Sequence, residues 1–127
     1  MNDLLARLAS CPGADARDKG CCYTVDLAAD RDLRFEVIVP KQTNEWFVTG
    51  KSHGEAVWED WAGYAADTDR GTADPQAEMH EDIERFVRRV GAVHFDLRVQ
   101  GERTDLMWSP DGRWQPFTLQ SFLHPAP

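Results

Sequence analysis

Apolar and polar residues alternate with a period of two along four segments of the chain, at residues 22–27, 33–39, 45–49 and 93–99. Such alternation places the apolar side chains of a strand on one face and its polar side chains on the other. Sheets with one packed face and one solvated face are typically antiparallel. The pattern therefore predicts a mostly antiparallel β-sheet.

Turn signals extend this pattern toward the C-terminal part of the sequence. Residues 100–103 read Gln-Gly-Glu-Arg and residues 109–112 read Ser-Pro-Asp-Gly. Both tetrapeptides contain residues that are favoured in tight turns. They predict hairpins that join residues 93–99, 106–108 and 113–117.

Residues 54–66 fit two patterns. Val57, Trp61 and Tyr64 have the spacing of one helix face. A strand would instead place on one face Ala56, Trp58, Asp60, Ala62 and Tyr64. The flanking glycines and the aromatic residues favour a strand or an irregular sheet edge.

One long helix is predicted over residues 75–90. Asp74 can cap it, Pro75 fits its first position, and Gly91 is placed for a left-handed stop. Helical spacing gives it an apolar stripe of Met79, Ile83, Phe86, Val87 and Val90. Ion pairs four residues apart are expected on its exposed side, Glu81 with Arg85 and Glu84 with Arg88.

The order of these elements defines the fold class. A short helix over residues 3–9 precedes three strands, the ambiguous segment, the long helix and three more strands. This order predicts an α+β protein in which the helices pack on one face of the sheet. With no internal repeat or linker, residues 1–127 are expected to form a single domain, which is long enough to bury a core.

Charge and cysteine content narrow the function classes. The net charge is −8, so nucleic acid is not an expected partner, because phosphate binding needs a basic footprint. No segment approaches the roughly 20 apolar residues of a membrane span, and no membrane partner is expected. Cys11, Cys21 and Cys22 are odd in number and two are adjacent, which favours reduced thiols and a cytoplasmic location.

Three segments resemble known motifs but depart from them. Residues 49–52 lack the first glycine of a phosphate-binding loop, and residues 80–84 lack the second histidine of a zinc-protease helix. Asp67, Asp69 and Glu78 have part of the spacing of a calcium loop, which stays open as a lesser alternative. The sequence therefore predicts no catalytic residues, no cofactor and no metal, and favours a protein that is not an enzyme.

Tryptophan is unusually abundant. The five residues are Trp46, Trp58, Trp61, Trp108 and Trp114. Trp46, Trp108 and Trp114 are expected in the core. For Trp58 and Trp61 a core position and an interface position are both open, because acidic residues surround them.

The negative charge is concentrated in one stretch. Between Glu55 and Glu84 there are ten acidic residues and one basic residue, a charge of −9. Acidic surfaces steer basic partners, and tryptophan is enriched at the energetic centres of interfaces. We therefore predict a non-catalytic binding protein whose acidic, tryptophan-bearing face binds a basic protein partner. The predicted partner-binding residues are Glu55, Trp58, Glu59, Asp60, Trp61, Asp67 and Asp69.

Size, charge and architecture are analogous to those of an immunity or antitoxin-type inhibitor that neutralises a basic toxin. The alternative is a small-ligand-binding domain with an aromatic-lined pocket between sheet and helix, in which His94 or His53 could support chemistry. The sequence leaves the oligomeric state and the identity of the partner or ligand open.

Overall fold

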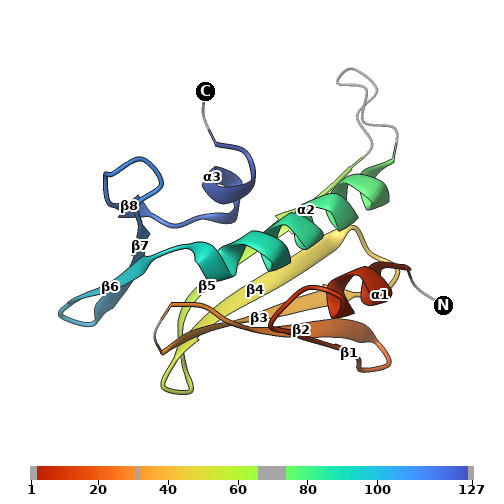
Figure 1. The fold of residues 1–127 in the computed structure, drawn as a ribbon, viewed down its shortest axis with the longest axis horizontal. Helices are drawn as coiled ribbons and strands as arrows, with labels where there is room; N and C mark the ends of the chain where they lie inside the picture. Colours follow the sequence, from red (N-terminus) through yellow and green to blue (C-terminus); the bar gives the residue numbers. More distant parts are fainter. Residues whose placement is uncertain (1–2, 31, 66–73, 126–127) are drawn as a thin grey trace.

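The computed structural model describes residues 3–30, 32–65 and 74–125, which form an α+β fold of two antiparallel sheets and several helices (Figure 1). The predicted fold class is confirmed. The elements in chain order are α1 (Asp3–Ala9), β1 (Ala14–Asp18), β2 (Cys22–Ala28), β3 (Leu33–Pro40), β4 (Glu45–Ser52), β5 (Glu55–Gly63), α2 (Pro75–Arg89), the 3₁₀ turn η1 (Val90–Ala92), β6 (Phe95–Gln100), β7 (Arg103–Trp108), β8 (Gln115–Pro116) and α3 (Leu119–Leu123).

The first sheet is a meander in which β1 to β5 pair in sequence order. Its register aligns alternate residues, so that Val25 faces Val37 and Val37 faces Val48 on one face. This inner face is apolar and buried, as the alternation in β2 and β3 predicts. Its members are Tyr23, Val25, Leu27, Leu33, Phe35, Val37, Val39, Trp46 and Val48.

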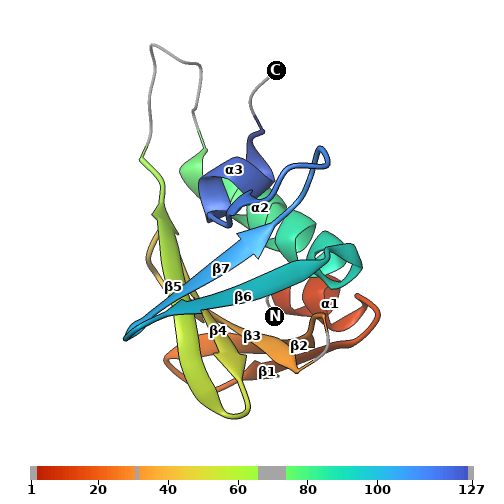
Figure 2. The same ribbon diagram turned by 90° about the vertical axis from the view of Figure 1, so that its left-hand side faces the viewer.

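Helices α1 and α2 cover the inner face of the first sheet (Figures 1 and 2). Asp74 caps α2 by accepting a hydrogen bond from the Ala77 amide at 3.0 Å. All five residues of the predicted stripe are buried. The prediction that Gly91 ends the helix in a left-handed conformation is wrong. Helix α2 continues into the 3₁₀ turn η1, and Gly91 within that turn has no positive φ angle.

A second sheet, β6-β7-β8, packs against the first through aromatic side chains. Phe35 of β3 is central to this packing, since its ring lies 5.5–6.0 Å from the rings of Trp58, Phe86, Phe95 and Phe117. These partners belong to β5, α2, β6 and the segment after β8. One core therefore joins both sheets and the long helix.

The C-terminal half departs from the prediction in several places. The alternation in β6 predicts a packed face, but Val99 is 68% exposed because the β6–β7 hairpin extends beyond the body of the molecule (Figure 1). Trp114, expected in the core, is 45% exposed in the loop before β8, where the Arg98 guanidinium lies over its ring. Of the expected third strand, residues 115–116 pair with β7, and the Phe117 amide also donates to the Leu106 carbonyl at 2.9 Å. Strand β1 and helix α3 are too short to give a clear periodic pattern.

Glu84 ties the two helices together. Its carboxylate accepts hydrogen bonds from Arg7 of α1 and from Arg88 one turn later in α2, which confirms the predicted Glu84–Arg88 pair. The predicted Glu81–Arg85 pair is wrong, since Arg85 turns to Asp82 and to the Leu123 carbonyl instead.

The ion pairs of Glu84 should make the free energy of unfolding depend on pH. The hydrogen bond from Arg88, together with Arg7, lowers the pKa of the Glu84 carboxyl in the folded protein. The unfolded state then binds more protons, so this contribution is present above about pH 4.3 and is lost as the pH falls through the folded-state pKa. We expect Glu84→Gln to lower the free energy of unfolding by about 0.5–1 kcal/mol at pH 7.

Urea denaturation at pH 7 and at about pH 3 would measure this difference, with Glu81→Gln as the control on the exposed side of the same helix. An equal loss for Glu84→Gln at both pH values would contradict the assigned role of the carboxylate.

Candidate functional site

The face of the first sheet opposite the helices, hereafter the outer sheet face, has no described helix over it (Figure 2). Antiparallel pairing places Thr24, Ile38, Phe47 and Trp61 in one row across β2 to β5. The rings of Phe47 and Trp61 are stacked, with centroids 6.5 Å apart and planes inclined by 28°. Trp61 is 58% exposed and Phe47 is 38% exposed. The outer sheet face therefore carries an exposed aromatic pair.

Acidic side chains form the next row of this face. Pairing along the row joins Asp15, Asp26, Glu36, Thr49 and Glu59. Glu36 pairs with Lys51 at 3.4 Å, and Asp15 pairs with Arg17 at 3.0 Å. Among the described residues, Asp26 and Glu59 have no ion-pair partner. The face therefore keeps uncompensated negative charge beside its aromatic pair.

Only part of the predicted partner-binding set lies on this face. Glu59 and Trp61 point outward, whereas Trp58 and Asp60 point inward because side chains alternate along β5. Glu55 is exposed at the start of the same strand. Asp67 and Asp69 lie outside the described residues.

The two inward-pointing residues fasten the C-terminal segment to β5. The Trp58 indole N–H donates to the Phe117 carbonyl at 3.0 Å, and its ring packs against Phe35. Both carboxylate oxygens of Asp60 are occupied, one by the Trp61 amide at 2.9 Å and the other by the Leu119 amide at 2.8 Å. Both residues therefore make structural contacts on the inner face.

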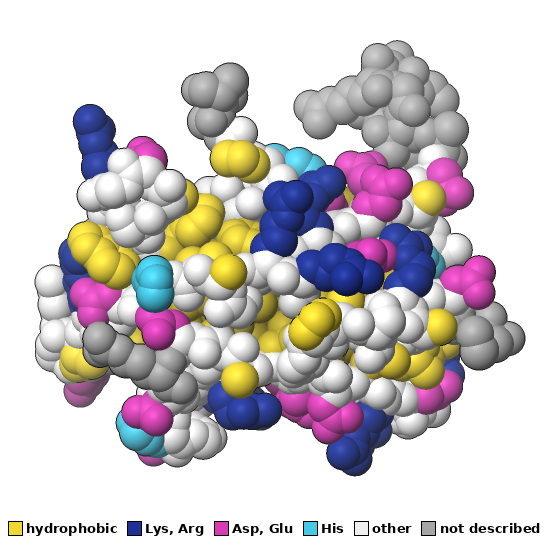
Figure 3. All heavy atoms as spheres, in the orientation of Figure 1, with side chains coloured by type: hydrophobic (Ala, Val, Ile, Leu, Met, Phe, Trp, Pro, Cys, Tyr) yellow, Lys and Arg dark blue, Asp and Glu magenta, His cyan; other side chains and the backbone are white. Residues whose placement is uncertain are grey.

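The acidic stretch of residues 55–84 does not form one surface in the part of the chain that the structure describes. Glu59 is on the outer sheet face, whereas Asp82 is buried and Glu84 is paired on α2, across the sheet. The helix-bearing side shows basic and acidic side chains intermixed over α2 (Figure 3). The acidic character of the outer sheet face instead comes from several strands.

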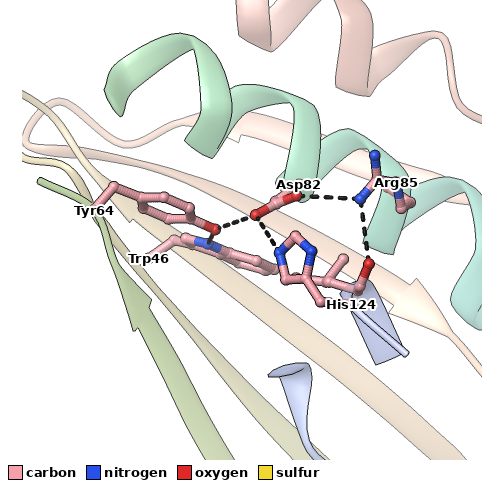
Figure 4. A network of polar contacts seen from close by, with 6 residues as sticks. Trp46, Tyr64, Asp82, Arg85 and His124 are labelled. Carbon is pink, nitrogen blue, oxygen red and sulfur yellow. Dashed lines mark hydrogen bonds and ion pairs between the residues drawn. The ribbon is translucent and has the colours of Figure 1, made fainter. Parts of the chain in front are cut away.

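A buried polar network lies at the C-terminal end of β5 (Figure 4). Asp82 of α2 is 3% exposed, and its carboxylate accepts a hydrogen bond from the Tyr64 hydroxyl at 2.7 Å. The Trp46 indole N–H donates to the same hydroxyl oxygen at 3.1 Å. Burial, followed by the nearby Asp82 charge, raises the pKa of Tyr64, so that the phenol stays protonated and can donate.

Two further residues complete this network (Figure 4). Arg85 donates from one nitrogen to Asp82 and to the Leu123 carbonyl, both at 3.3 Å. The His124 ring nitrogen Nε2 lies 3.4 Å from Asp82. The network therefore links α2 to the end of β5 and to α3. The sequence does contain a signal for it, because position 82 lies three residues after Met79 on the buried side of the helix.

An open cleft of about 500 Å³ adjoins the network. The end of β5, helix α2 and helix α3 line it, through Trp61, Tyr64, Glu78, Asp82 and His124 among others. The alternative prediction of a pocket between sheet and helix thus has a candidate location. His53 and His94, either of which could support chemistry in that alternative, lie elsewhere and are mostly exposed, beside Asp32 and Asp30 respectively.

Comparisons with known proteins do not indicate a function. No family model matches the sequence, and searches of curated proteins and of solved structures found no match. Within the described ranges, no helix is both long and apolar enough to span a membrane. The same residues contain no group of three or more His, Cys, Asp or Glu side chains placed to hold a metal ion.

Proposed function

We propose that the protein is a non-catalytic binding domain whose outer sheet face docks a basic protein partner. The observation that carries this proposal is the stacked pair of Phe47 and Trp61, which is exposed on a sheet face that no helix of the described residues covers. Large aromatic side chains that are exposed together on a polar surface are typical of interface centres.

Charge supports a basic partner. The outward positions of β1 to β5 hold more acidic than basic side chains: Asp15, Asp26, Glu36, Glu45 and Glu59 against Arg17, Arg34 and Lys51. Complementary charge around an aromatic centre speeds association and favours partners of opposite sign. An immunity-type inhibitor that masks the basic surface of a toxin would use a face of this kind. We propose that this protein is such an inhibitor and that its partner is a basic toxin.

The proposal revises the predicted binding residues. The proposed partner-binding residues are now Trp61 and Glu59, which were predicted, together with Phe47, Asp26 and Glu36. Trp58 and Asp60 leave it, because their hydrogen bonds to Phe117 and Leu119 make them structural.

Affinity capture with tagged protein would test the proposal. A lysate of the source organism is applied at low and at high salt, and the retained proteins are identified and quantified by mass spectrometry. We expect a basic protein in stoichiometric amount that salt releases, and at least a 10-fold weaker retention by Trp61→Ser, since truncating an interface centre costs about 2 kcal/mol or more.

Matched variants separate the outer sheet face from general surface effects. Trp114→Ser removes an exposed tryptophan of the second sheet, and Glu81→Lys reverses an acid of α2, whereas Glu59→Lys reverses an acid of the outer sheet face. Retention that is insensitive to Trp61→Ser and Glu59→Lys, or no retained basic protein at either salt, would reject the proposal.

A further inference from the structure

We propose that the adjacent cysteines Cys21 and Cys22 form a dithiol site for a trivalent arsenical, an arsenic(III) centre that carries one organic group. The pair lies where the turn after β1 enters β2. Both thiols are free, Cys21 is exposed and Cys22 is half-buried, so a small reagent can reach them. The proposed partner-binding residues and the buried network do not include either cysteine, and the site is independent of the proposed function.

A bend before β2 brings the two sulfur atoms together. Neighbouring side chains within a strand point to opposite faces of the sheet. Cys21, however, lies in the bend, and β2 begins only at Cys22. The Cys22 thiol donates a hydrogen bond to the Cys21 sulfur. The two sulfur atoms are therefore close enough to bind one atom between them.

Backbone hydrogen bonds hold the pair from both sides. The Lys41 amide donates to the Cys21 carbonyl at 3.0 Å, and the Lys19 amide donates to the Cys22 carbonyl at 2.9 Å. Cys22 also lies opposite Pro40 in the pairing of β2 with β3. Because these contacts already order the turn, little conformational freedom is lost when both sulfurs bind one ligand.

A neighbouring cation favours the deprotonated form that the ligand requires. Burial, followed by the hydrogen bond with Cys21, raises the pKa of the Cys22 thiol, so this thiol is protonated in the free site at neutral pH. The Lys41 ammonium acts in the opposite direction, although Asp18, its ion-pair partner at 2.9 Å, offsets part of that effect. Lys41 therefore stabilises the thiolate charge that develops when the ligand displaces the thiol protons.

The number and kind of ligands select the class. Thiolates prefer soft centres to hard cations. Structural zinc sites take four protein ligands, but within the described ranges no three His, Cys, Asp or Glu side chains are placed together to hold a metal ion. The third cysteine, Cys11, is buried and donates to the Arg7 carbonyl of α1. An arsenical whose third bond is to carbon needs only two sulfur ligands.

Binding of an arsenoso compound, in which arsenic carries one oxygen and one organic group, needs no oxidant or reductant. Two sulfur–arsenic bonds form and the bonds between arsenic and oxygen break. The oxygen takes the two thiol protons and leaves as water. Arsenic stays trivalent, and both sulfurs keep their oxidation state.

Phenylarsine oxide would test the site. The purified full chain is reduced, freed of reductant and titrated with this reagent, and the adduct is measured by native mass spectrometry. We expect one arsenical per chain, and about 100-fold weaker binding by Cys21→Ser and by Cys22→Ser, because the second sulfur–arsenic bond then no longer forms within one molecule. Dithiothreitol, itself a dithiol, should remove the arsenical, whereas excess 2-mercaptoethanol should not.

Cys11→Ser is the matched control, since it makes the same change at the buried thiol and should bind phenylarsine oxide as the wild type does. A circular dichroism melt verifies that each variant is folded. The absence of an adduct, an adduct of unchanged affinity in Cys21→Ser or Cys22→Ser, or its loss in Cys11→Ser would overturn the inference. Because no partner protein is present in this titration, its outcome is separate from that of the affinity capture.

Discussion

Replacing Phe35 by alanine is expected to lower the free energy of unfolding by about 3–5 kcal/mol. The ring is 1% exposed and contacts aromatic rings from four other segments of the chain. Its removal leaves a cavity where the two sheets and α2 meet, and these elements cannot all move to fill it. Urea denaturation followed by tryptophan fluorescence would measure the loss.

Phe47→Ala provides the matched control, since Phe47 is the phenylalanine of the next strand on the opposite face. It is 38% exposed and stacks only on Trp61 among the described aromatic pairs, so its loss should cost less than half as much. Equal losses for the two variants would show that the core is not centred on Phe35.

Replacing Asp82 by alanine should cost about 2–4 kcal/mol of unfolding free energy. The variant leaves the half-buried Tyr64 hydroxyl without its acceptor and the Arg85 guanidinium without its carboxylate. Because Arg85 donates to the Leu123 carbonyl of α3 and His124, which caps the C-terminus of α3, contacts Asp82, this helix should exchange its amide hydrogens faster in the variant.

Urea denaturation and hydrogen exchange would measure both effects. Glu81→Ala, the neighbouring exposed acid, should change stability by less than about 0.5 kcal/mol. If Asp82→Ala were as stable as Glu81→Ala, the buried network would not contribute to holding α3.

Helix α2 and strands β2 and β3 could be predicted because each buries one face only. Their apolar residues then recur with one clear period, 3.6 in α2 and 2 in the strands. The sequence of β5 is ambiguous for the opposite reason. Trp58 packs inside and Trp61 stacks on the outer face, so aromatic residues occur on both sides and no single period is visible.

The outer sheet face could not be read from the sequence, because its rows come from strand pairing. Glu59 was predicted to act with its neighbours in the chain, but pairing places it in the row of Asp26 and Glu36. Sequence proximity also grouped Glu59 with Asp60, which alternation sends to the other face. The summed charge of the residues along one strand therefore does not predict the charge of either sheet face.

The hydrogen bonds that fasten residues 117–124 to the rest of the molecule constrain how the chain can fold during synthesis. Trp58 and Asp60 of β5, and Asp82 and Arg85 of α2, all bond to this segment. A nascent chain that has emerged only through α2 would have the meander and its helix, but Phe35 and Trp58 would lack the Phe117 ring that covers them. Completion of the core must therefore wait for the C-terminal segment to leave the ribosome, and until then the aromatic surface is available to chaperones.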